Sequence, residues 1–225
     1  MCGRFTLTDP DPRRLRTRFA LDEAAQLDEK PRFNIAPTDP VLAIRERGSG
    51  GREPGRLRWG LMPGRWAEGH RSLINARAET LDSQPAFRES FHERRCLVPA
   101  DGFYEWRTDE NGRQAVWISR ADGELFAFAG VWAEAPGRGG RPVHSCAIVT
   151  CEPNAVVRPI HDRMPVILDA GAEDQWLSQS AGLDELRDVL RPLADDALEV
   201  REVADAVNDV RNDGPGLIES PLRLF

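Results

Sequence analysis

The second residue of the chain is a cysteine, and its position gives it chemistry that an internal cysteine lacks. A small residue at position 2 normally allows removal of Met1, which would leave Cys2 with a free α-amine beside its thiol. Such an amine has a pKa of about 7.7–8.0, against about 10.4 for lysine, so it is far more often neutral at pH 7. The amine condenses with an aldehyde to an imine, and proximity then favours closure of a thiazolidine ring by the thiol. Position 2 therefore predicts a covalent nucleophile for aldehydes.

The alternative is that Cys2 is an incidental residue at a disordered chain start. The residues that follow it, Gly3-Arg4-Phe5, favour an ordered and tightly packed terminus instead. Lys30 is the only lysine in the chain. If this protein carries out amine chemistry, it therefore has almost no lysine with which to do it.

Two further segments place polar groups among apolar neighbours, at Asn75 and at Glu105. A carboxylate between Tyr104 and Trp106 should be partly desolvated, which raises its pKa toward the range of a useful acid or base. Asn75 could donate a hydrogen bond to a reacting group, and Arg77, two residues later, could hold a phosphate. The structural alternatives are that Glu105 pairs with a buried arginine and that Asn75 is a turn residue.

A third polar segment lies between Pro159 and Pro165, just before an apolar stretch. His161 could transfer protons near pH 7, and Arg163 could pair with a phosphate. A lone histidine is more often structural, so the case for His161 depends on its neighbours.

Aromatic side chains beside arginines are suited to stacking on unpaired bases. Trp66 follows a Pro-Gly pair and is adjacent to Arg65, and Trp106 follows the candidate acid Glu105. The alternative, that a tryptophan fills the core, is at least as good for Trp59, which lies in an apolar run.

The composition is that of a soluble globular protein. Of 225 residues, 40% are hydrophobic and 30% charged, and no stretch reaches the roughly 20 apolar residues that span a bilayer. The N-terminus has no apolar signal region, so we expect a cytoplasmic protein. The four cysteines form no CxxC pair, so neither a disulfide scaffold nor a metal site is indicated, and no cofactor is expected.

The net charge of −7 at first argues against nucleic acid. Residues 1–168 carry 25 basic and 23 acidic side chains, a net of +2, whereas residues 169–225 carry 5 and 14, a net of −9. The acidity is therefore confined to the last quarter of the chain. A basic groove in the first three quarters remains compatible with the composition.

The elements that must position these residues are many short strands and a few helices. We expect strands over 41–46, 114–119, 125–132, 144–150 and 164–168, a strand and turn over 198–207, helices from residue 12 and over 172–177 and 183–193, a loop over 31–40 and a hairpin tip over 136–142. This pattern predicts an α+β fold with a curled, mostly antiparallel sheet or barrel and peripheral helices. Residues 1–225 should form a single compact domain, with the acidic quarter 169–225 as part of it.

Taken together, several segments resemble the SRAP family, the SOS-response-associated peptidases, in order and across nearly the whole chain. The matching segments are 1–5 (MCGRF), 31–38 (PRFNIAPT), 58–66 (RWGLMPGRW), 73–79 (LINARAE), 96–106 (CLVPADGFYEW), 128–132 and 160–165 (IHDRMP), with a weaker match at 207–213. Each motif alone is weak, but seven in order make the resemblance specific.

The resemblance implies a protein that senses abasic sites in single-stranded DNA and crosslinks to them through a Cys2 thiazolidine, which protects the lesion. Cys2, Asn75, Glu105 and His161 would be catalytic, with Asn75 orienting the reacting centre, Glu105 assisting opening of the sugar and His161 assisting formation or reversal of the imine. The residues implied to contact DNA are Arg4, Asn34, Trp66, Arg77, Trp106 and Arg163. The acidic quarter should face away from the DNA.

The family name further implies peptidase or autoproteolytic activity that removes the residue before Cys2, and a lyase-type activity on DNA. The expected partner is single-stranded DNA with abasic sites, with no membrane and no obligate protein partner. We expect a monomer that is nucleoid-associated when it is bound to damaged DNA.

Two other functions remain open. Glutamine amidotransferases of class II also begin Met-Cys-Gly, but they resemble one another in an isoleucine after the glycine, where this chain has Arg4. They also carry a synthase or synthetase domain that this chain lacks. The third possibility is a single-stranded DNA-binding module without catalysis.

Overall fold

The computed structural model describes residues 2–48, 50–64, 72–110, 112–137 and 141–221. Its strands are β1 Phe5–Leu7, β2 Arg32–Ile35, β3 Pro40–Glu46, β4 Arg52–Trp59, β5 Asn75–Arg77, β6 Arg95–Ala100, β7 Gly102–Asp109, β8 Gly112–Arg120, β9 Phe126–Ala135, β10 Val143–Cys151, β11 Met164–Pro165, β12 Ile167–Leu168 and β13 Leu198–Glu202. The helices are α1 Pro12–Phe19, α2 Arg88–Glu93, α3 Ala170–Leu177 and α4 Leu183–Asp188, with short 3-10 turns η1 Ala78–Thr80, η3 Asp195–Ala197, η4 Asp205–Asn208 and η5 Pro215–Leu217.

Strands β3, β4, β6, β9 and β10 form a closed barrel. Along the order β10-β4-β3-β6-β9, each strand pairs with the next, and β9 pairs back onto β10. These pairings are antiparallel except where β10 runs parallel to β4, and β10 also pairs in parallel with β5. Closure satisfies the backbone hydrogen bonds of strands that would otherwise be edges. The expected α+β fold with a mostly antiparallel curled sheet is confirmed.

A second sheet, in the order β13-β8-β7-β1-β2, lies against the barrel. Strand β6 of the barrel continues into β7 of this sheet with only Asp101 between them. The Asp101 carboxylate accepts hydrogen bonds from the Thr6 hydroxyl at 2.6 Å and from the Thr8 backbone N–H at 2.5 Å. The junction between the sheets thus also holds the first strand of the chain.

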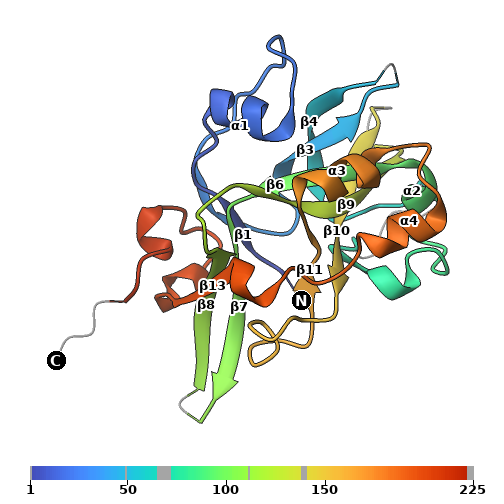
Figure 1. Ribbon diagram of the computed structural model, residues 1–225. Helices are drawn as coiled ribbons and strands as arrows, with labels where there is room; N and C mark the ends of the chain where they lie inside the picture. The colour runs from blue at the N-terminus through green and yellow to red at the C-terminus, as the bar shows by residue number, and fades with distance from the viewer. Residues whose placement is uncertain (1, 49, 65–71, 111, 138–140, 222–225) are drawn as a thin grey trace.

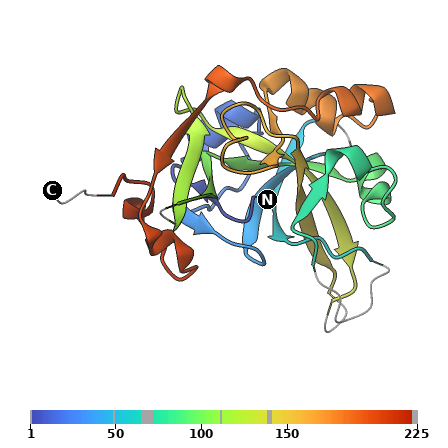
Figure 2. The ribbon, with the colours of Figure 1, turned by 90° about the horizontal axis from the view of Figure 1, so that it is seen from below.

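The ring of Phe5 anchors β1 to the barrel. It packs edge to face on Trp59 and on Phe128, with ring centroids 5.1 and 5.6 Å apart, and it is buried. Buried aromatic pairs of this geometry stabilise a fold beyond the area that they bury. In Figures 1 and 2 the first described residues, drawn blue, lie near the middle of the molecule between the two sheets.

Most of the expected elements are present. Helix α1 begins as expected, with Pro12 at its first turn and Asp11 capping it through hydrogen bonds from two backbone N–H groups. The expected loop over 31–40 is wrong in part, because residues 32–35 form β2, which pairs with β1. The helix expected over 183–193 ends at Asp188. The sequence pattern does not predict strands β1, β4, β5, β6 and β7 or helix α2.

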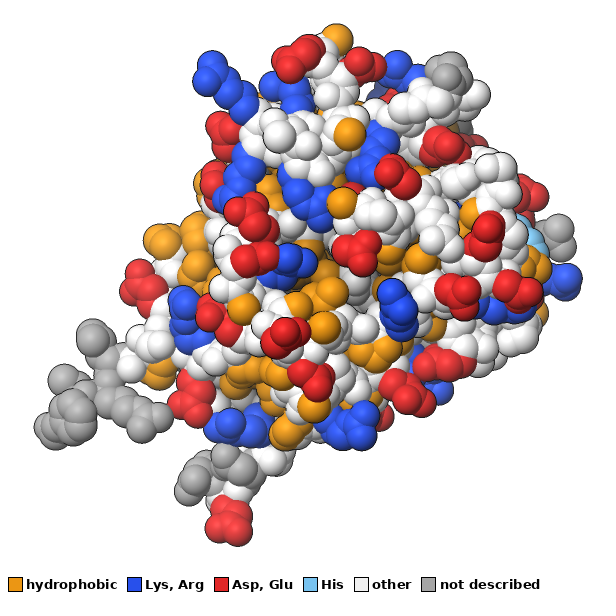
Figure 3. Space-filling view, in the orientation of Figure 1, with side chains coloured by type: hydrophobic (Ala, Val, Ile, Leu, Met, Phe, Trp, Pro, Cys, Tyr) orange, Lys and Arg blue, Asp and Glu red, His pale blue; other side chains and the backbone are white. Residues whose placement is uncertain are grey.

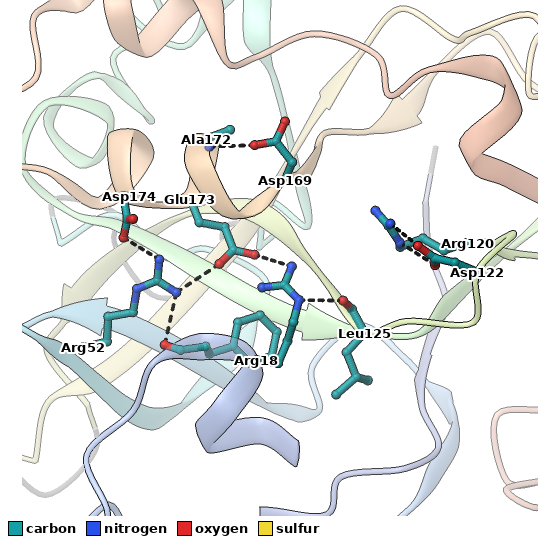
Figure 4. A network of polar contacts seen from close by, with 10 residues as sticks. Arg18, Arg52, Arg120, Asp122, Leu125, Asp169, Ala172, Glu173 and Asp174 are labelled. Atoms are coloured by element: carbon teal, nitrogen blue, oxygen red, sulfur yellow. Dashed lines mark hydrogen bonds and ion pairs between the residues drawn. The ribbon is translucent and has the colours of Figure 1, made fainter. Parts of the chain in front are cut away.

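The helical layer is held to the barrel by a buried ion cluster (Figure 4). Glu173 of α3 has no exposed surface, and its carboxylate accepts from Arg18 of α1 at 2.7 Å and from Arg52 of β4 at 3.0 Å. Arg52 also pairs with Asp174 at 2.7 Å. Because removing one partner of a buried ion pair typically costs about 3–5 kcal/mol, this cluster fixes α1 and α3 on the barrel.

Candidate active site

The chain start lies against β5. The side-chain amide of Asn75 donates a hydrogen bond to the backbone carbonyl of Cys2 at 2.9 Å. The other end of this amide, Asn75 Oδ1, is buried and accepts no hydrogen bond from the residues that the structure describes. An unsatisfied buried acceptor is costly, so its persistence here, next to the chain terminus, is typical of a functional site.

The thiol of Cys2 is fully buried. Its Sγ lies 3.7 Å from the carbonyl oxygen of Arg4. Burial raises the pKa of this thiol far above its usual value, and the negative charge of Glu105 raises it further. At neutral pH the sulfur is therefore a protonated thiol, and it needs a proton acceptor before it can act as a strong nucleophile.

Glu105 points from β7 into the protein, and only 2% of it is exposed. Burial raises the pKa of its carboxyl group, while the charge of His161 partly offsets that rise. The direction of this shift confirms the expectation from sequence, but its cause differs. Tyr104 packs on the opposite face of the strand, in a second apolar cluster with Trp106 beside it, so the main core desolvates Glu105.

His161 lies between β10 and β11, and 28% of its side chain is exposed. Its charge acts on Glu105, and the charge of Glu105 acts on Cys2. Together with the hydrogen bond from Asn75, these interactions bring the four expected catalytic residues to one place. They come from the chain start, β5, β7 and the loop after β10.

Two expected DNA contacts are placed where a strand could reach them. Arg77 is exposed at the end of β5, and its positive charge acts on Glu79. Trp106 is half-buried, its indole N–H donates to Asn208 Oδ1 at 2.7 Å, and Arg113 lies 4.9 Å over its ring. Trp66 lies outside the described residues.

The structure does not support a DNA contact for Asn34. Only 2% of Asn34 is exposed. Its amide donates to the backbone carbonyls of Val207, Asp209 and Asn212, and its carbonyl oxygen accepts from Arg4 at 2.9 Å. With both ends of the amide engaged, Asn34 holds the C-terminal segment against the chain start.

Arg4 and Arg163, expected at phosphates, are both engaged by protein atoms. Arg4 also donates to the carbonyl of Val207 at 2.9 Å. Arg163 forms a two-point ion pair with Glu79, at 2.7 and 2.9 Å, and its side chain is only 12% exposed. A phosphate could reach Arg163 only by competing with Glu79.

Sequence reasoning missed Arg113, Asn208 and Glu79. Arg113 could have been found from a β7–β8 hairpin, because pairing Trp106 with Ala115 brings Arg113 close to the Trp106 ring. No local pattern points to the contact of Asn208 with Trp106 or of Glu79 with Arg163, because these pairs are 102 and 84 residues apart in the chain.

Charge on the protein surface is mixed. On the face in Figure 3, basic and acidic side chains alternate among apolar patches, with no large area of one sign among the residues described. Within the described ranges no three potential metal-binding side chains cluster together. No described helix has the length and apolar character needed to cross a membrane.

Comparisons with known proteins agree with this geometry. The family model of the SOS response associated peptidases (SRAP) matches residues 1–210. Two proteins of Bacillus subtilis (strain 168), the abasic site processing proteins YoqW and YoaM, are 40% and 39% identical, and each alignment covers 98% of this chain and at least 98% of the relative. A crystal structure of a Bacteroides thetaiotaomicron protein has the same fold, with a TM-score of 0.85 at 22% identity over 98% of this chain and 100% of that one. The chain belongs to the SOS response associated peptidase family.

Proposed function

We propose that this protein captures abasic sites in single-stranded DNA by forming a covalent bond through Cys2. The observation that carries the proposal is the contact of Asn75 with the Cys2 backbone, which holds the chain terminus beside the buried acid Glu105. The relatives YoqW and YoaM are named abasic site processing proteins, which supports the choice of substrate.

The reaction begins once removal of Met1 has converted the Cys2 nitrogen into a primary amine. The amine attacks C1′ of the ring-opened sugar, and the resulting carbinolamine loses water to give an imine. The Cys2 sulfur then adds to the imine carbon while its proton passes to the imine nitrogen, which closes the thiazolidine. One water leaves and no electron acceptor is needed, so the steps balance with the groups at hand.

The buried groups fit these steps. The raised pKa of Glu105 keeps its carboxyl protonated to a higher pH than an ordinary glutamate, so it can donate a proton to the sugar and later accept one from the thiol. The free Oδ1 of Asn75 can accept a hydrogen bond from the new amine. His161, half in solvent, exchanges protons with Glu105 and water.

Binding of the strand is assigned to Arg77 for a phosphate and to Trp106 for a base, with Trp66 as a further stacking candidate. Arg4 and Arg163 would join them only after releasing protein partners. Stacking and phosphate contacts together suit single strands without sequence preference.

We further propose that the peptidase activity in the family description is self-removal of Met1. Cys2 follows that bond, and the other catalytic candidates lie near it through the hydrogen bond from Asn75 and the linked charges of Glu105 and His161, so the same groups would serve both reactions.

The covalent step can be tested on a denaturing gel. Single-stranded DNA with one abasic site should give a stable shifted band with the wild-type protein, and DNA with a tetrahydrofuran analogue should not, because it has no aldehyde. Cys2→Ala should lose the band, while Cys151→Ala, which removes another buried thiol, should keep it. Cys2→Ser retains an amine, so its adduct should survive only after borohydride reduction. A stable band with Cys2→Ala would exclude the proposed nucleophile, and ammonia release from glutamine would favour an amidotransferase.

Glu105→Gln should slow adduct formation by about 10²-fold, the usual contribution of an acid–base group, with little change in DNA affinity.

Glu105→Gln should also be more stable to unfolding than the wild type, by a difference that grows as pH rises. Folding raises the pKa of the Glu105 carboxyl, so as pH rises this carboxyl loses its proton in the unfolded chain before it does so in the native protein. The free energy of unfolding of the wild type therefore falls once the pH exceeds the pKa of an ordinary glutamate. Urea unfolding at pH 4 and pH 8 measures this. A constant stability difference between these pH values, or a collapse of DNA affinity, would assign Glu105 to structure or binding.

Arg77→Ala should weaken binding and reduce the slope of log K against log salt by about 0.7, the value for one phosphate contact on a single strand. Titration of fluorescent single-stranded DNA at several salt concentrations gives this slope. Arg88, an exposed arginine on α2, provides a matched control in Arg88→Ala, whose slope should equal that of the wild type. If the slope of Arg77→Ala is also unchanged, Arg77 does not contact a phosphate.

A further inference from the structure

The guanidinium group of Arg163 is held at three points. Two nitrogens pair with the carboxylate of Glu79 in η1, at 2.7 and 2.9 Å, and one of them also donates to the backbone carbonyl of Thr150 in β10 at 2.6 Å. A two-point arginine–carboxylate pair fixes orientation as well as distance. The pair with Arg163 also lowers the pKa of Glu79, so the carboxylate stays ionised. The side chain of Arg163 is thereby fastened to η1 and to β10.

The backbone of Arg163 acts directly on His161. The N–H of Arg163 donates to Nδ1 of the imidazole at 3.0 Å, whereas the carboxylate of Asp162 lies 2.7 Å from the same nitrogen. The two contacts require opposite states of Nδ1. It must be unprotonated to accept from the N–H of Arg163, and it must carry a proton to donate to the carboxylate of Asp162. Asp162 is 86% exposed, so its contact with the ring is weak. The backbone N–H of Arg163 is held in place because the side chain of the same residue is bound to Glu79 and Thr150. The neutral ring therefore accepts at Nδ1 and carries its proton on Nε2, and Asp162 helps only the protonated ring.

We propose that Glu79 is a positioning residue of the active site, which acts through Arg163 to fix the orientation and tautomer of His161. The predicted effect of Glu79 on catalysis rests on the proposed function, whereas the tautomer of the imidazole can be measured without any reaction. Among the described residues, the carboxylates that act on His161 are Glu105 from β7 and Asp162 from its own segment, and the backbone N–H of Arg163 contacts the ring.

Loss of the Glu79 carboxylate changes this arrangement in a defined direction. The Arg163 side chain then keeps only its contact with the Thr150 carbonyl, so its backbone N–H is held less firmly against Nδ1. Both neutral tautomers therefore become populated.

The test is a pH titration of the histidine imidazoles by long-range proton–nitrogen NMR on the free protein. There are four histidines, and the signals of His161 are assigned by their loss in His161→Gln. The wild type should show a neutral ring protonated on Nε2. Glu79→Ala and Glu79→Gln should show a mixture of tautomers. Glu89→Gln is a matched control, because Glu89 is a similarly exposed carboxylate with one arginine partner, Arg94, and it should leave the His161 signals unchanged.

Adduct formation with abasic single-stranded DNA supplies the second readout. Both Glu79 variants should slow it about tenfold, whereas Glu89→Gln should leave the rate unchanged. A wild-type tautomer and a wild-type rate in both Glu79 variants would overturn the proposal. A wild-type protein that forms no adduct while Glu79→Ala alters the tautomer would instead refute the proposed function and leave the positioning role intact.

Discussion

The whole site depends on the amino end of the chain being held inside the fold. The three residues of β1 are paired on both sides, with β2 and β7, and the Phe5 ring is packed against two aromatic rings of the barrel. Chain termini are usually mobile unless they are tied down in this way. Because Cys2 is only three residues before Phe5, anchoring the strand also fixes the position at which a processed terminus would present its nitrogen and sulfur.

The groups around that terminus are ones that a fold built only for stability would avoid. The Glu105 carboxyl is buried at a cost that its raised pKa reflects, and the Asn75 amide leaves one buried oxygen without a partner in the described structure. Other buried polar side chains, such as Asn34 and Glu173, are hydrogen-bonded to the framework, although Arg16 and Arg18 each leave one buried nitrogen without a hydrogen bond among the described residues. A buried carboxyl beside an unsatisfied amide oxygen is expected where a protein maintains reactivity at the expense of stability.

Much of this arrangement could be predicted from the sequence. Position 2 is chemically distinctive whatever the fold, and the polar residues at Asn75, Glu105 and His161 are conspicuous because their neighbours are apolar. The roles of Asn34 and Arg163 could not be inferred, since they depend on carbonyls of residues 207–212 and on Glu79, which only the folded chain brings near. The strand over 32–35 was hidden by its flanking prolines and by its pairing with β1, a tertiary contact that overrides local preference.

Peptide mapping of the protein–DNA adduct by mass spectrometry tests the central claim most directly. After nuclease and protease digestion, the sugar remnant should be found on a peptide that begins at Cys2, with Met1 absent and both the nitrogen and the sulfur of Cys2 blocked. A remnant on Lys30, or on a peptide that still begins with Met1, would contradict the account.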